Sequence, residues 1–193
     1  MRHQILIAFL VLITSISYGQ NTLNTYYEAI QANEPNSEFP FGQMNTNAPE
    51  ETRQFEFMVG VSHCTDSILN PDGTYRVFPS IWRAKYFLNG YGIQDNNFNA
   101  VNPTTNLRVY NSQTKAWNVI YLQSANGYFS GEWEGKLNEG NEIVLTAEVR
   151  GNTSKLLFYN ISDEGYSWHS ETIKPDGTSF VGWIKHCVKQ KEL

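Results

Sequence analysis

Short runs of alternating hydrophobic and polar residues dominate the chain from Phe55 to about residue 190. Turn-forming residues interrupt these runs at intervals of about 8 to 12 residues, the spacing of strands in a β-sandwich or β-barrel. The tetrapeptide Pro-Asp-Gly-Thr occurs at 71–74 and again at 175–178, and Asn89-Gly90 marks a further corner. In the repeated tetrapeptide Pro sets φ, and Asp-Gly supplies the positive-φ positions that a tight hairpin requires. The pattern predicts about ten antiparallel strands with short connections.

This pattern indicates the all-β class and, within it, a single antiparallel up-and-down β-barrel of about ten strands over residues 55–190. In such a barrel with an even number of strands, the first strand lies beside the last. Cys64 and Cys187 lie in the first and the last strand-like run. One structural disulfide between them would therefore join the two strands that close the barrel.

The first residues follow a different pattern. Residues 1–19 contain Arg2, then an apolar run from Ile5 to Ile13, then small or polar residues, which is the order of a signal peptide. The apolar run is shorter than the about 20 residues that a membrane span needs. We expect cleavage near Gly19/Gln20 and, because no cysteine lies at that junction, no lipid anchor. The expected location is secreted or periplasmic.

Residues 20–54 form a predicted N-terminal extension to the barrel domain. A short helix is expected from Tyr26 to Ala32, and a linker rich in Pro and Asn follows it. This segment either lies against the barrel or across one end of it, or it is a disordered linker.

The composition narrows the range of partners. The formal net charge is −5 at pH 7, and loss of Arg2 with the leader makes it one unit more negative. The chain has no run of Lys or Arg, so neither nucleic acid nor an anionic membrane surface is an expected partner. The aromatic content of 14% suits strands and equally suits an aromatic-lined cavity. We expect a small hydrophobic or aromatic molecule as the partner of a monomer or weak oligomer.

Alternation assigns faces to the two strands that contain cysteine. In the first strand the apolar residues share the parity of His63, and in the last strand most of them share the parity of His186. Cys64 and Cys187 have the opposite parity. If the apolar parity faces inward, both histidines point into the interior and both cysteines point outward. Trp183 does not fit this parity, and a β-bulge near it would reverse the local assignment.

The candidate ligand-binding residues are aromatic side chains of the strands together with the two histidines: Trp82, Trp117, Tyr121, Trp133, Trp168, His63 and His186. Histidine titrates near neutral pH, so the candidate catalytic residues are His63, His186 and Glu171. No metal ligand is assigned, because the chain contains no His-Glu-x-x-His motif and no acidic calcium loop. The cofactor, if any, is left open.

Four segments occur in a characteristic order: Phe55–Gly60, the Trp82 strand ending in Leu88-Asn89-Gly90, Leu107–Asn111 leading to Trp117, and 163–168. In this order and spacing the chain resembles the DUF1579 group of calycin-like, or lipocalin-like, barrels over residues 55–190. The leader is similar to those of exported Bacteroidetes proteins. The Trp that commonly follows the opening Gly of that group is replaced here by Val61-Ser62-His63-Cys64.

The resemblance implies a barrel whose function is largely unassigned. Relatives in shape include the haem-binding nitrobindins, whose haem ligand is a late-strand His, and His186 occupies a comparable position. The nitrobindin opening Gly-x-Trp-x-Gly-x-Gly is absent from this chain.

Four functional hypotheses follow. The leading one is an exported protein that binds a small apolar or aromatic ligand inside the barrel. The second is a lumen-based enzyme of isomerase, cyclase or lyase type that uses His63 or His186 as acid or base. The third is a haem-binding or metal-binding barrel, and the fourth is an interaction module that uses its outer face.

Overall fold

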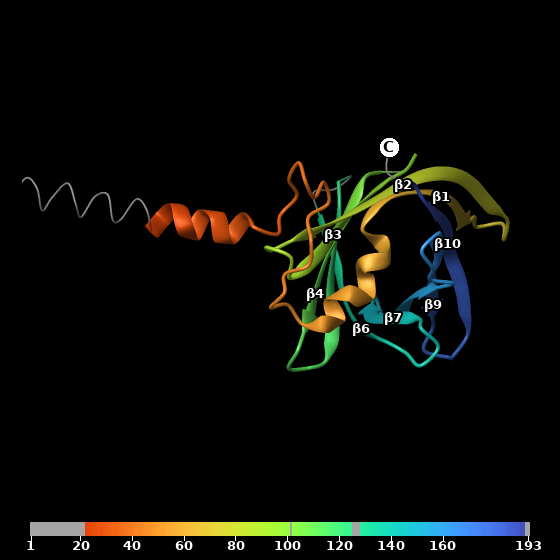
Figure 1. The fold of residues 1–193 in the computed structure, drawn as a ribbon. Coiled ribbons are helices and arrows are strands. Elements are labelled where there is room, and N and C mark those ends of the chain that lie inside the picture. Colours follow the sequence, from red (N-terminus) through yellow and green to blue (C-terminus); the bar gives the residue numbers. More distant parts are fainter. Residues whose placement is uncertain (1–21, 101, 125–127, 192–193) are drawn as a thin grey trace, which may run out of the picture.

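Among the described residues, ten antiparallel strands form a closed barrel in the computed structural model of this protein (Figure 1). The structure describes residues 22–100, 102–124 and 128–191, with only the backbone at 128–130. The strands follow one another around the barrel in chain order, and β10 closes it against β1. The predicted all-β, up-and-down barrel of about ten strands is confirmed. The strands are β1 (Gly60–Leu69), β2 (Tyr75–Phe87), β3 (Gly92–Phe98), β4 (Thr104–Asn111), β5 (Ala116–Gln123), β6 (Tyr128–Leu137), β7 (Ile143–Val149), β8 (Asn152–Tyr159), β9 (Gly165–Ile173) and β10 (Ser179–Lys189).

The repeated Pro-Asp-Gly-Thr sequence forms the same turn in the β1–β2 and β9–β10 hairpins. Asp72 Oδ1 accepts a hydrogen bond from the backbone N–H of Thr74, and Asp176 Oδ1 accepts one from Thr178, each at 2.9 Å. The glycine of each turn has a positive φ, 85° at Gly73 and 84° at 177. Identical local chemistry therefore produces identical hairpins at two distant places in the chain.

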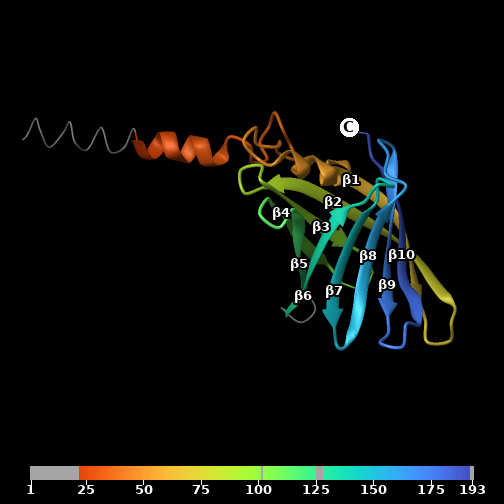
Figure 2. The ribbon, with the colours of Figure 1, turned by 90° about the horizontal axis from the view of Figure 1, so that it is seen from below.

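A 3₁₀ helix, η1 (Glu50–Met58), lies across one end of the barrel (Figures 1 and 2). Its Phe55 is fully buried, and the centroid of that ring lies 4.8 Å from the Trp117 ring and 5.3 Å from the Phe158 ring. β1 begins only at Gly60. Phe55 therefore belongs to a helix, and the strand alternation that was expected to begin at Phe55 begins only at Gly60.

The segment before η1 contacts the barrel through hydrogen bonds, such as that from the Tyr86 N–H to the Phe41 carbonyl, and through Met44, which packs against the hydrophobic core. A helix at 22–31 projects away from the barrel, and its Leu23, Tyr26, Tyr27 and Ile30 side chains are all exposed (Figure 2). Asn89 holds the chain near this helix, because its Nδ2 donates to the Ala29 carbonyl at 2.8 Å. The predicted signal peptide and its cleavage position near Gly19/Gln20 lie outside the described residues. No helix in the described part of the chain is long and apolar enough to cross a membrane.

The predicted disulfide is present between Cys64 of β1 and Cys187 of β10, which are opposite each other in the strand register. Both cysteines face the interior and are only 4% exposed, so the expectation that they face outward is wrong. The expectation that His63 and His186 face inward is wrong as well, because both side chains are exposed on the outer face. The expected parity rests partly on apolar residues that belong to η1 and not to β1, and a bulge between Val181 and Trp183 shifts the register of β10.

Candidate functional site

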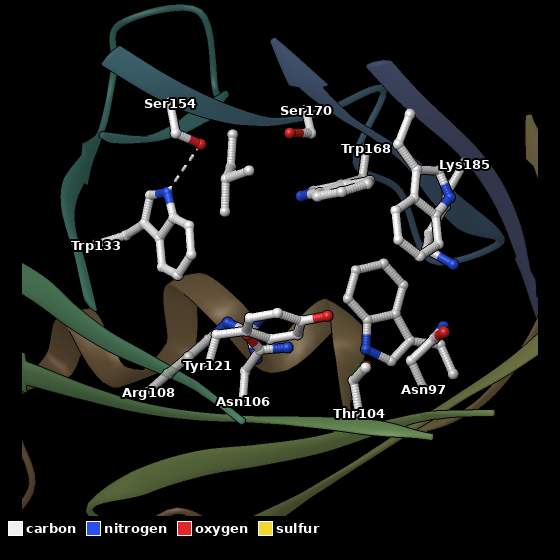
Figure 3. A pocket seen from close by; sticks show the side chains of 13 residues that line it. Asn97, Thr104, Asn106, Arg108, Tyr121, Trp133, Ser154, Trp168, Ser170 and Lys185 are labelled. Atoms are coloured by element: carbon white, nitrogen blue, oxygen red, sulfur yellow. Dashed lines mark hydrogen bonds between the residues drawn. The ribbon is translucent and has the colours of Figure 1, made fainter. Parts of the chain in front are cut away.

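The interior of the barrel holds a partly open cavity of about 160 Å³, lined mainly by aromatic and polar side chains from eight of the strands (Figure 3). Its aromatic walls come from widely separated parts of the chain: Trp82, Tyr121, Trp133, Trp168 and Trp183. The polar groups that line it are Asn97, Thr104, Asn106, Arg108, Ser154, Ser170 and Lys185, and Leu156 completes the lining. All of these side chains reach the cavity because each takes the inward position in its strand.

The aromatic side chains form two groups on opposite sides of the cavity. On one side the centroids of Tyr121 and Trp133 lie 6.1 Å apart, nearly perpendicular to each other. On the other side Trp168 contacts Trp82 at 6.1 Å and Trp183 at 5.9 Å, again edge to face. Figure 3 shows Trp133 and Trp168 across the cavity from each other. Edge-to-face packing leaves ring faces and edges available to a planar guest between the groups.

One buried ion pair underlies this cavity near β3 and β4. Arg108 pairs with Asp95, and both side chains are almost completely buried. Asp95 also accepts hydrogen bonds from Trp82 Nε1 at 2.7 Å and from Asn106 Nδ2 at 3.0 Å. Burial lowers the pKa of Arg108 to about 9. The guanidinium therefore remains charged at neutral pH beside its carboxylate.

A second buried ion pair lies near the barrel closure. Lys185 of β10 pairs with Asp66 of β1, which also accepts hydrogen bonds from the Ser80 hydroxyl and, at 2.5 Å, from Trp183 Nε1. The Lys185 ammonium lies 4.7 Å from the Trp183 ring centroid and 5.4 Å from that of Trp82. Burial lowers the pKa of Lys185, and the neighbouring Asp66 carboxylate opposes that shift. The two ion pairs have the same arrangement. In each, the cation lines the cavity, its carboxylate partner is buried, and a Trp Nε1 donates a hydrogen bond to that carboxylate.

The structure brings together four of the aromatic residues chosen from the sequence as ligand-binding candidates: Trp82, Tyr121, Trp133 and Trp168. Trp117 lies elsewhere. It is fully buried against Phe55 of η1, and its Nε1 donates to Gln54 Oε1 at 2.9 Å. Trp117 therefore belongs to the closed end of the barrel and not to the cavity wall.

The candidate catalytic residues do not reach the cavity. His63 and His186 are exposed on the outer face, where His186 Nδ1 lies 3.0 Å from the Ser167 hydroxyl. Glu171 alternates with the inward Ser170, accepts a hydrogen bond from the Ser179 hydroxyl at 2.6 Å and pairs with Lys155. None of the three can transfer a proton to a molecule in the cavity, and neither histidine can ligate haem there. Among the described residues, no cluster of three or more His, Cys, Asp or Glu side chains is placed to hold a metal ion.

Sequence reasoning missed Trp183 and the two ion pairs. A usable signal was present, because pairing Cys64 with Cys187 in an antiparallel register also places Asp66 directly opposite Lys185. Opposite charges at facing positions on adjacent strands indicate a cross-strand pair. Charged side chains on strands usually face solvent, so local alternation alone does not place these two cations inside the barrel.

Comparisons with known proteins bear on the fold. No known family model and no curated protein matches the chain. The structure of the S-type phycobiliprotein lyase CPES from Guillardia theta is similar, with a TM-score of 0.50 and 11% sequence identity, covering 72% of this chain and 92% of the lyase chain. The fold is a calycin-like barrel. At this level of identity the similarity shows the fold alone, and the resemblance to the DUF1579 group stays a prediction.

Proposed function

We propose that this protein binds a small, mainly apolar or aromatic molecule in the cavity of its barrel. The observation that carries the proposal is the lining itself, in which five aromatic side chains surround a space of about 160 Å³. An apolar cavity of about 150 Å³ holds one benzene molecule. The space therefore fits a ligand with a single ring, and concave sites with mostly apolar walls and a few placed polar groups are typical of small-molecule binding.

Native mass spectrometry and titration test the proposal directly. The oxidised protein, purified without its leader, is examined for a co-purified organic mass and then titrated with toluene and benzene. Because Trp side chains line the cavity, their fluorescence reports occupancy. We expect saturable quenching with one molecule per barrel. Absence of a bound mass together with no response to either probe contradicts the proposal.

Two variants of β9 separate cavity binding from adsorption to the surface. Ser170 lines the cavity, and Ser170→Phe fills part of it. The adjacent His169 takes the opposite, outward position, so His169→Phe adds a ring of similar size without entering the cavity. We expect Ser170→Phe to weaken toluene binding at least about tenfold, because overfilled sites reject a guest. His169→Phe should bind as the unmodified protein does.

We also propose that the protein acts outside the cytoplasm, in the periplasm or after secretion, and that it is related to the DUF1579 group. The leader pattern of residues 1–19 and a disulfide between the strands that close the barrel support this location. Expression of the full chain in a bacterium, followed by fractionation and mass analysis, tests it. A mature chain that starts near Gln20 in the exported fraction is expected, and full-length protein retained in the cytoplasm contradicts it.

A further inference from the structure

One buried amide in the cavity wall has a donor without an acceptor. Asn97 of β3 is only 3% exposed, lines the cavity, and its Nδ2 has no hydrogen-bond partner among the described residues. A buried N–H group without an acceptor has lost its hydrogen bonds to water and gained nothing in exchange. An acceptor on a bound molecule would satisfy it.

The hydrogen bonds around Asn97 determine which end of its amide is free. The backbone N–H of Asn102 donates to Asn99 Oδ1 at 3.1 Å, so the other end of the Asn99 side chain is its NH₂ group. Asn99 Nδ2 in turn donates to Asn97 Oδ1 at 2.6 Å. The oxygen of Asn97 is therefore engaged, and its NH₂ group is the free end.

The charged side chains that line the cavity are hydrogen-bond donors, as is the free amide group of Asn97. Arg108 and Lys185 line the space, whereas their partners Asp95 and Asp66 are fully buried and are absent from the described lining. A guest consequently meets N–H donors and no carboxylate. Each cation is already neutralised by its own carboxylate, so an added negative charge would be buried without a counter-charge. A neutral hydrogen-bond acceptor on the ligand would pair with the donors and would add no buried charge.

We infer that the ligand is a neutral aromatic molecule carrying a carbonyl oxygen, with its ring between the two aromatic groups and its oxygen on Asn97 Nδ2. This inference rests on the proposed function and specifies the ligand class of the same cavity. Carbonyl oxygen is a strong neutral acceptor, and a one-ring ketone is of a size that the space of about 160 Å³ accommodates. Hydrocarbon guests of the same shape leave the amide unsatisfied.

The test compares acetophenone with α-methylstyrene, which has the same shape but carries CH₂ in place of the carbonyl oxygen. Calorimetric titration of the full oxidised protein should give about tenfold tighter binding of acetophenone, the effect of one net hydrogen bond. Benzoate should bind more weakly than acetophenone. The infrared carbonyl stretch of bound acetophenone should lie below its value in hexane, which reports the hydrogen bond without any substitution.

Matched variants of β3 assign the effect to Asn97. Asn97→Leu keeps the approximate volume and removes the donor, and should bring the two affinities within about threefold of each other while α-methylstyrene still binds. The neighbouring Asn96 takes the outward position, so Asn96→Leu should leave the tenfold preference intact. Circular dichroism verifies that both variants are folded.

The outcomes separate this inference from the function on which it rests. Equal binding of the two probes, with a carbonyl stretch as in hexane, overturns the ligand class and leaves aromatic binding in place. Tighter binding of benzoate overturns the requirement for a neutral ligand. Failure of both probes to bind overturns the proposed function itself.

Discussion

The buried Asp66 carboxylate depends on its polar neighbours for its stability inside the barrel. It is fully buried and contacts Lys185, the Ser80 hydroxyl and Trp183 Nε1. A carboxylate with this many donors is compatible with a buried position, but it becomes costly once its cation is removed. The same holds for Asp95 beside Arg108.

Removing only the cation should therefore lower the free energy of unfolding more than removing both charges of the pair. We expect Lys185→Met to lower the free energy of unfolding by about 3–5 kcal/mol, because it leaves Asp66 buried without its counter-charge. The double variant Asp66→Asn/Lys185→Met should recover much of that loss. Urea denaturation followed by Trp fluorescence measures both, with the exposed Lys174→Met as control. Equal losses for the single and double variants would contradict this account.

Tyr166 makes stability depend on alkaline pH. Its phenol is buried, and burial raises its pKa above the ordinary value of 10.0. Above pH 10 the unfolded chain releases this proton while the folded chain retains it, so the folded state binds more protons and the free energy of unfolding falls as pH rises. Below pH 10 both states hold the proton and the contribution is complete.

Tyr166→Phe keeps the ring and removes the ionisable group. Urea denaturation is measured between about pH 8 and pH 11, a range that brackets the ordinary tyrosine pKa. The free energy of unfolding should fall less steeply with pH in the variant than in the unmodified protein. Burial also raises the pKa of Tyr86. Tyr86 therefore contributes to the fall of the unfolding free energy with pH in both proteins. Parallel curves would show that Tyr166 ionises equally in both states.

At the scale of elements, η1 replaces what would otherwise be the beginning of a strand. Phe55 packs edge to face on Trp117 and Phe158, which makes this short helix part of the hydrophobic core. A 3₁₀ helix has weak intrinsic stability, so its position depends on this packing. The helix therefore follows from burial more than from local preference.

Shortening the side chain of Phe55 should destabilise the whole protein. We expect Phe55→Ala to lower the free energy of unfolding by about 3–5 kcal/mol, because the cavity left behind has no neighbour able to fill it completely. Phe98→Ala is the matched control, since Phe98 is 49% exposed on β3, and its loss should stay within about 0.5 kcal/mol. Chemical denaturation measures both values, and a small effect for Phe55 would show that η1 opens without disturbing the barrel.

Closure of the barrel is a property of the whole molecule. The disulfide joins residues separated by 123 positions, so in the unfolded state it restricts nearly the entire barrel chain. In the chain-entropy description a loop of this length is worth about 5 kcal/mol of stability. Main-chain pairing of β1 with β10 remains when the disulfide is removed.

We therefore expect Cys64→Ala/Cys187→Ala to fold into the same barrel with a free energy of unfolding lower by about 5 kcal/mol. Chemical denaturation of the variant and of the oxidised protein measures the difference, and near-ultraviolet circular dichroism shows whether the Trp environment is retained. A variant that loses its near-ultraviolet signal would show that strand pairing alone does not close this barrel.

The sequence alone was sufficient for the architecture because the deciding signals are local. Turn residues such as Gly73 and Asn89 mark the corners, period-two alternation marks the strands, and both act within a few residues. Two cysteines at the ends of an even-stranded meander then determined the closure and the disulfide. Aromatic side chains spread over the strands were also sufficient to predict an aromatic interior.

Only the tertiary structure decided what faces that interior. A shift of one residue exchanges every side chain of a strand between the two faces, and β1, which begins only after η1, has the register that places Cys64 inside and His63 outside. It also decided that Arg108 and Lys185 are inside, because each is stabilised by a carboxylate from another strand. Such long-range pairing is not encoded in the local pattern, and it sets the polarity of the cavity.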